Sequence, residues 1–210
     1  MNEIKTNFEF KDDRSYVHSS TICDEITNRV LPQLLFEHGG LVLDAKFHRF
    51  FNKDGTFICQ EKPFSEDLLR GAVADFRLST RSGYVYILLR DDGGEILKRS
   101  KANYSVTDVE LLEPYTGFAK IYMDGYSNFF SNIIEANKRI HLMSGLNGDL
   151  KVINVYMKKL QLDLPFNNKN GVMVNIENVS IRKHLKGLMT LNKISLMGSD
   201  INFDICYFIG

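Results

Sequence analysis

Hydrophobic residues follow two different periods along the first half of the chain. A four-residue period predicts a helix that begins near Ser20, ends near Phe36 and presents one apolar stripe: Ile22, Ile26, Val30 and Leu34. Pro32 lies inside this stretch and predicts either a kink or an early end near Arg29. Alternation with a period of two then predicts a strand over 41–51.

A series of alternating segments completes the first half. An irregular polar stretch over 60–70 predicts a loop, and three strands are expected after it: 72–80, 83–90 and 95–106. The turn between the last two strands has the sequence Asp91-Asp92-Gly93-Gly94. This is a strong hairpin signal, because glycine readily adopts the positive φ angles of tight hairpin turns.

The second half repeats this order of elements. A short strand over 118–123 precedes a helix over about 127–143, and a long alternating strand over 152–164 follows. After a loop, three more strands are expected: 172–182, 188–197 and 201–209. The repeat is one of pattern and not of residue identity, and it predicts two similar halves, 1–112 and 113–210.

The charge balance and the cysteines argue against several classes of protein. Lys plus Arg and Asp plus Glu each total 26, so the formal net charge is zero. This balance gives no electrostatic reason to expect a nucleic acid or an anionic membrane as partner, and it is compatible with self-association. Three widely spaced cysteines without a CxxC pair argue against a disulfide framework and a zinc site, and we expect no metal or other cofactor.

Targeting segments and common catalytic signatures are missing from the sequence. The N-terminus has no apolar signal region, and no apolar run approaches the roughly 20 residues that span a bilayer. We therefore expect a cytoplasmic protein without a membrane partner. The P-loop, GxGxxG, HExxH and GxSxG signatures are also absent, which removes the usual nucleotide-binding, zinc-protease and serine-hydrolase hypotheses.

The order of one helix followed by a run of antiparallel strands resembles the hotdog fold, in which a sheet wraps around a central helix. The segments 72–106, with Asp91-Asp92-Gly93-Gly94, and 172–209 look like the closing strands of that fold. Two copies in one chain resemble the double-hotdog proteins, which include fatty-acid and polyketide dehydratases, acyl-thioesterases and the A-factor-biosynthesis type. The resemblance implies an α+β tandem hotdog with two long central helices wrapped by antiparallel sheet.

The resemblance also implies chemistry on an acyl chain that acyl carrier protein or coenzyme A carries as a thioester. The sheet and helix would leave an apolar tunnel for the chain, and free N–H groups at a helix start would face the thioester oxygen. Two dehydratase-type signatures, GHFPG and HxxxGxxxxP, are absent from the sequence. A non-catalytic protein that binds an acyl chain or a protein partner is therefore an open alternative, as is an α+β interaction module unrelated to hotdogs.

Three residues are candidates for acid–base chemistry. His18, just before the first helix, resembles the dehydratase histidine that removes the α-proton of the acyl thioester, and an imidazole titrates near neutral pH. Glu135 has an Ile-Glu-Ala setting similar to that of the dehydratase proton donor, and Glu25 occupies the comparable place in the first helix. Alternatives stay open: His18 also fits a surface or helix-capping role, and Glu135 also fits a solvent-facing position.

Three further residues are candidates for substrate binding, and their positions follow from the expected helix starts. Ser20 and Ser127 lie at the two N-termini, and Asp124 precedes the second helix, where it also fits a turn with Gly125. His141 is expected near the C-terminus of the second helix, where a positive charge is favourable and no chemistry is needed. Either a monomer or a homodimer is consistent with the pattern.

Overall fold

The computed structural model describes residues 2–33, 40–80, 82–122, 128–146, 150–158, 171–185, 187–199 and 201–209. The chain divides into two compact units, Met1–Asn103 and Tyr104–Gly210. The predicted boundary between 112 and 113 falls inside the strand β8 (Val106–Glu113), whereas the observed division places that whole strand in the second unit.

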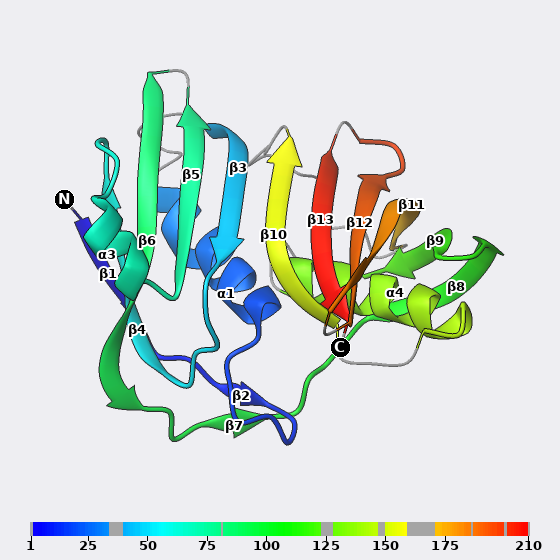
Figure 1. The fold of residues 1–210 in the computed structure, drawn as a ribbon, viewed down its shortest axis with the longest axis horizontal. Helices are drawn as coiled ribbons and strands as arrows, with labels where there is room; N and C mark the ends of the chain where they lie inside the picture. Colours follow the sequence, from blue (N-terminus) through cyan, green and yellow to red (C-terminus); the bar gives the residue numbers. More distant parts are fainter. Residues whose placement is uncertain are drawn as a thin grey trace. The chain divides into compact units, whose positions relative to one another are not determined.

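The first unit contains an antiparallel sheet with the strand order β1-β4-β6-β5-β3. A short parallel pair, β2 and β7, lies apart from it (Figure 1). The bounds of these strands are β1 Asn2–Thr6, β2 Phe10–Lys11, β3 Gly40–Phe47, β4 Lys53–Gln60, β5 Ala74–Thr80, β6 Gly83–Glu95 and β7 Arg99–Ser100.

The helical segment of the first unit is continuous but not uniform. It consists of α1 (Ser19–Glu25), a π-helix η1 (Ile26–Val30) and a further helical stretch over 31–33. In the π-helix the Leu31 N–H donates to the Ile26 carbonyl five residues earlier. Pro32 has no N–H and its ring crowds the preceding turn, and a wider turn relieves that crowding. The disturbance predicted from Pro32 thus takes the form of a π-helix.

The core of the first unit lies between this helical segment and one face of the sheet (Figure 1). Alternate residues of β5 are buried, which is the pattern of a strand with one face in the core. The residues that fill this core are large and apolar: Ile22, Ile26, Leu43, Phe57, Phe76, Leu78 and Ile87. A smaller cluster around Leu88 includes Leu69 of the short helix α3 (Glu66–Gly71), and it lies on the other face because neighbouring strand residues point in opposite directions.

The sequence Asp91-Asp92-Gly93-Gly94 does not form a hairpin turn, which corrects the prediction. These residues lie within β6, and the register against β4 shifts between Lys53 and Gly55, so this part of β6 is a bulge. Gly93 has a φ of 77°, and its N–H donates to Asp91 Oδ1 over 2.8 Å. The local turn chemistry is therefore present, but pairing with β4 continues past it. The strand expected over 95–106 is not observed. Of the described residues between β6 and β8, Arg99 and Ser100 form the two-residue strand β7, and the others are not in a strand.

The second unit contains an antiparallel sheet with the strand order β10-β13-β12-β11-β9-β8 and the helix α4 (Phe129–Met143), which runs alongside β9 and β8 (Figure 1). The remaining strand bounds are β9 Thr116–Ile121, β10 Leu150–Lys158, β11 Val172–His184, β12 Gly187–Leu196 and β13 Asn202–Ile209. The helix and the last three strands lie close to their predicted positions.

The core of the second unit is built on aromatic side chains from α4 and β13. The rings of Phe129 and Phe130 contact each other at 5.1 Å between centroids, and both contact Phe203 at 5.5 and 5.9 Å. Burial of each such ring stabilises the fold by about 1.5–3 kcal/mol. The predicted α+β organisation with antiparallel sheets is confirmed. The finer picture of two long central α-helices stays a prediction, since α4 has 15 residues and α1 has seven.

Candidate functional site

His18 is the N-cap residue of α1. Its backbone is extended, with φ −74° and ψ 144°, and its carbonyl accepts the Ile22 N–H over 3.1 Å. Within the described part of the chain its side chain makes no capping bond to the helix backbone. The Nδ1 atom instead lies 3.1 Å from the Ser20 hydroxyl oxygen. If Nδ1 carries the ring proton and donates to Ser20, the lone pair of the neutral ring is on Nε2.

The segment before α1 is fixed to a neighbouring loop, and this contact determines where His18 lies. The Val17 N–H donates to the Phe51 carbonyl over 2.6 Å. The Tyr16 ring stacks on the His18 ring at 5.9 Å between centroids and meets the Phe50 ring edge-on at 5.0 Å. The imidazole is half-buried in this aromatic setting. It is therefore held in place while part of it remains accessible.

Buried polar side chains follow His18 along the helix. Ser20, Asp24 and Thr27 are 4%, 7% and 2% exposed, and their spacing places them on one face. The Thr27 hydroxyl donates to the backbone carbonyls of Cys23 and Asp24. Burial and the adjacent Asp24 carboxylate raise the pKa of the Cys23 thiol well above its ordinary value, which disfavours the thiolate form. Asp24 was not singled out by the sequence patterns, because Glu25 beside it has the same chemistry.

Glu25 lies on the half-exposed side of the helix and forms an ion pair with Arg29. The Arg29 Nη1 atom is 3.3 Å from Glu25 Oε2. Burial raises the pKa of Glu25, and the Arg29 charge partly opposes this shift. Seven residues separate Glu25 from His18, which is about 10 Å along a helix axis. The two side chains could act on two points of one ligand, but they are too far apart along the helix to exchange a proton directly.

Glu135 lies in the middle of α4 and is neither solvent-facing nor isolated in an apolar setting. Its carboxylate accepts a hydrogen bond from Arg139 Nε over 2.9 Å, and its side chain is 17% exposed. Arg139 Nη1 also donates to the Val106 carbonyl over 2.9 Å. The ion pair therefore connects the helix to β8. A role of Glu135 as proton donor requires this contact to open.

The other predicted binding residues, Ser127 and Asp124, lie outside the described residues. Five positions after Ser127 in the sequence, Asn132 is a polar residue that the sequence patterns did not single out. Its side chain is buried, its Oδ1 accepts the Ser105 N–H, and its Nδ2 donates to the Tyr122 carbonyl, each over 3.0 Å. Asn132 thus joins the first turn of α4 to the backbone at the start of β8 and the end of β9. The sequence feature that could have identified Asn132 is its position among apolar residues of the helix.

The structure also corrects the expectation for His141. It lies near the C-terminus of α4, as predicted, but it is fully buried and not a surface cation. Burial lowers its pKa, and a hydrogen bond with the Asn137 carbonyl partly opposes this shift. The neutral ring is therefore favoured.

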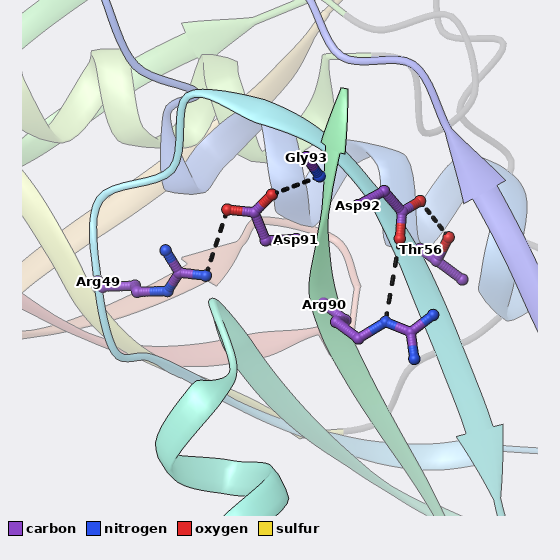
Figure 2. Close-up of polar contacts among 6 residues, drawn as sticks. All are labelled: Arg49, Thr56, Arg90, Asp91, Asp92 and Gly93. Atoms are coloured by element: carbon purple, nitrogen blue, oxygen red, sulfur yellow. Dashed lines mark hydrogen bonds and ion pairs between the residues drawn. The ribbon is translucent and has the colours of Figure 1, made fainter. Parts of the chain in front are cut away.

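A second polar cluster surrounds the bulge in β6 (Figure 2). Asp91 lies 3.4 Å from Arg49, and Asp92 accepts a hydrogen bond from the Thr56 hydroxyl and lies 4.0 Å from Arg90. The Thr56 contact joins the bulge to β4, and the Arg49 contact joins it to the loop before β4. Among the described residues, no group of three or more His, Cys, Asp or Glu side chains could hold a metal ion.

Solved structures of low sequence identity share the architecture. A candidate thioesterase II from Thermobifida fusca YX has a TM-score of 0.55 at 9% identity, covering 100% of this chain and 93% of that chain. A protein of unknown function with a hot dog fold from Alicyclobacillus acidocaldarius has a TM-score of 0.53 at 7% identity, covering 99% and 92%. The tesB protein of Mycobacterium avium subs. paratuberculosis has a TM-score of 0.52 at 5% identity, covering 96% and 91%.

The chain has a hotdog fold. This confirms the resemblance that the order of helices and strands predicted. No protein-family model and no curated protein matches the sequence, so the hotdog assignment comes from the fold and not from shared residues. None of the helices in the described residues is long and apolar enough to cross a bilayer.

Proposed function

We propose that this hotdog protein binds, and acts on, an acyl chain that acyl carrier protein or coenzyme A carries as a thioester. The observation that supports this most directly is the position of His18, which is half-buried at the start of a buried helix in the first unit. One solved structure with the same fold, the candidate thioesterase II, supports this class of chemistry by its description.

The proposed roles follow from the contacts of the first helix. His18 acts as the base, and its Nδ1 contact with Ser20 orients the ring. The start of the helical run, at Ser20, offers N–H groups to the thioester carbonyl oxygen. Glu25 is a candidate acid because burial raises its pKa, and Asp24 joins it as a buried carboxyl group on the same helix.

The second unit supplies the remaining residues of the proposal. Glu135 is the candidate proton donor there, and Ser127 and Asp124 are the candidate binding residues before α4. Each unit is proposed as one half of a tandem hotdog with a central helix. A monomer would then pair its own halves, and a homodimer is the alternative. The proposal includes a cytoplasmic location.

A second candidate function is non-catalytic binding of an acyl chain or a protein partner. Both candidate glutamates are engaged by an arginine four residues later on the same helix, at 3.3 Å for Glu25 and 2.9 Å for Glu135. This is the arrangement of a helix-stabilising ion pair. It favours a structural role for these carboxylates.

Two assays on the full chain distinguish the two functions. Hydrolysis of acyl-coenzyme A and acyl carrier protein thioesters of several chain lengths releases a thiol, and dehydration of 3-hydroxyacyl thioesters forms an enoyl product and water. We expect turnover of at least one substrate and a loss of about 100-fold or more in His18→Ala. His48→Gln is the matched control, because His48 is partly exposed and bonded to Asp75 in the same unit. Equal turnover by His18→Ala and the control would remove His18 from the mechanism. Binding without turnover would support the non-catalytic function.

A further inference from the structure

Two polar residues on α4 lie in the core of the second unit, away from the proposed thioester chemistry. Asn137 and His141 are both 0% exposed, and as an i, i+4 pair they are neighbours on one helix face. The His141 ring contacts two tyrosine rings, with centroid distances of 5.6 Å to Tyr115, in the turn between β8 and β9, and 6.4 Å to Tyr207 of β13. An amide and an imidazole thus occupy positions that aromatic or aliphatic side chains fill elsewhere along α4.

The hydrogen bond of His141 fixes which ring nitrogen carries the proton. Nδ1 lies 2.8 Å from the Asn137 backbone carbonyl oxygen. A carbonyl oxygen only accepts hydrogen bonds, so Nδ1 is the donor. In the neutral ring, which burial favours, Nε2 is then an acceptor with a lone pair directed away from that carbonyl.

Three buried polar atoms of this pair have no hydrogen-bond partner among the described residues. They are His141 Nε2 and the two side-chain atoms of Asn137, Nδ2 and Oδ1. Buried polar atoms in native structures are nearly always bonded to protein groups or to a small molecule such as water. Polar side chains of β11 and β12 in the same unit show the usual situation, since Asn178 donates to Asn192 and Asn192 donates to Thr190.

The hydrogen-bonding roles of these unpartnered atoms determine which chemical group could bind to them. His141 Nε2 requires a hydrogen-bond donor, and Asn137 Nδ2 requires an acceptor. Because the two residues are neighbours on the helix surface, both partners must lie close together. A hydroxyl group supplies both from one oxygen atom. A carboxylate has no proton for Nε2, and an ammonium has no acceptor for Nδ2.

We propose that Asn137 and His141 form an internal binding site for a single hydroxyl group, which donates to Nε2 of His141 and accepts from Nδ2 of Asn137. The hydroxyl has two sources: a buried water molecule, or a hydroxyl carried on an acyl ligand. The site does not depend on the proposed function, because a water would occupy it whether or not the protein binds thioesters.

Nitrogen-15 NMR of histidine-labelled full-length protein tests this site. A long-range proton–nitrogen spectrum identifies the tautomer of each ring, and acceptance of a hydrogen bond moves an unprotonated ring nitrogen upfield. The His141 signal is assigned through its loss in His141→Gln, or by elimination with glutamine variants of the other four histidines, His18, His38, His48 and His184. We expect the Nδ1–H tautomer with an upfield-shifted Nε2. Asn137→Leu, which has similar volume and no polar atoms, should reduce that shift.

The source of the hydroxyl is determined by adding matched ligands. A 3-hydroxyacyl pantetheine and the unsubstituted acyl pantetheine of the same length are compared. A shifted Nε2 that neither ligand changes identifies water, and a change with the hydroxylated ligand alone identifies the ligand hydroxyl. An Nε2 resonance at the position of a nitrogen without a hydrogen bond, in the free protein and with both ligands, would overturn the proposal. The wild-type spectra decide this even if a variant does not fold.

Discussion

The longest helical segments of the two units bury their polar residues in different ways. In the first unit the buried polar side chains of Ser20, Asp24 and Thr27 lie close to the helix start and to the half-buried His18. In the second unit Asn137 and His141 are fully enclosed in the last two turns of α4. Reactive groups that meet a ligand need access, and the start of the first helix is the more accessible of the two, which is why the chemical site is proposed there. The polar pair of α4 has the properties of an internal site.

The helices also differ in regularity. The first passes from α1 into a π-helix before Pro32, whereas α4 is a regular helix of 15 residues. π-helical turns occur often at functional sites, because they direct side chains away from the regular spacing. The comparison suggests that α4 is the more rigid support and that the first helix is the more specialised one. Four measurements can break or sharpen this contrast.

The largest expected effect is the loss of a core ring from α4. Phe130→Ala should lower the free energy of unfolding by about 3–5 kcal/mol, because Phe130 is fully buried against Phe129 and Phe203. Urea unfolding followed by circular dichroism measures this loss. Ile26→Ala in the π-helix should cost less, about 2–4 kcal/mol, because it removes fewer atoms and a wider turn relaxes more easily. A larger loss in Ile26→Ala would contradict the view that α4 is the more rigid support.

The next effect comes from hydrogen bonds that join different elements. Asn132→Ala leaves the part-buried Ser105 N–H and Tyr122 carbonyl without their side-chain partner, and the loss of both bonds should cost about 1–3 kcal/mol in total. Thr27→Val removes hydrogen bonds that stay within one helix, and should cost about 1 kcal/mol or less. Urea titrations of both variants give the comparison. Similar losses would mean that Asn132 does not join α4 to the strands in solution.

The third measurement is the pH dependence of the free energy of unfolding. Folding raises the pKa of Glu25 and lowers that of His141, so the two groups have opposite effects on this dependence. Burial lowers the pKa of His141 below its ordinary value of 6.5, so the unfolded chain takes up this proton first as the pH falls. The free energy of unfolding should therefore decrease as the pH falls below about 6.5, and His141→Gln should remove that decrease. Hydrogen bonding of Nε2 to a hydroxyl adds to the same preference for the neutral ring.

Glu25 shows the reverse dependence. Burial raises the pKa of Glu25 above its ordinary value of 4.5, so the folded protein keeps this proton to a higher pH than the unfolded chain. Its contribution is largest below about 4.5 and is lost as the pH rises through the folded pKa. Glu25→Gln should remove this trend and leave the one below pH 6.5 unchanged. If Glu25→Gln altered the slope assigned to His141, the two groups would not titrate independently.

The sequence predicted some elements well because their signals are local. The helix expected over 127–143 was observed as Phe129–Met143, since its apolar period is uninterrupted by proline or glycine. The sequence Asp91-Asp92-Gly93-Gly94 misled, because only pairing with the distant strand β4 decides whether such residues form a turn or a bulge. For the π-helix, the sequence predicted only that Pro32 would disturb the helix, and not the form of the disturbance.

The candidate site was predictable to a similar extent. The position of His18 before a helix follows from the adjacent serines, and the structure places it at the N-cap. The burial of His141 could not be predicted, because it depends on Tyr115 and Tyr207, which are far apart in the sequence. Glu25 and Glu135 each have an arginine four residues later in the sequence. This spacing predicts the ion pairs that the structure contains, and the hypothesis that these glutamates are catalytic acids did not consider it.

The smallest expected effect distinguishes these two ion pairs. Arg29→Ala should lower the free energy of unfolding by about 0.3–0.5 kcal/mol, because the Arg29–Glu25 pair is largely exposed and lies within one helix. Arg139→Ala should cost more, about 1 kcal/mol, because Arg139 also donates to the Val106 carbonyl and so joins α4 to β8. Arg139→Lys, which keeps the charge but not the forked geometry, should recover only part of the loss. Equal losses in the two alanine variants would show that the Val106 contact contributes nothing, and Glu135 would then be as free as Glu25 to take part in chemistry.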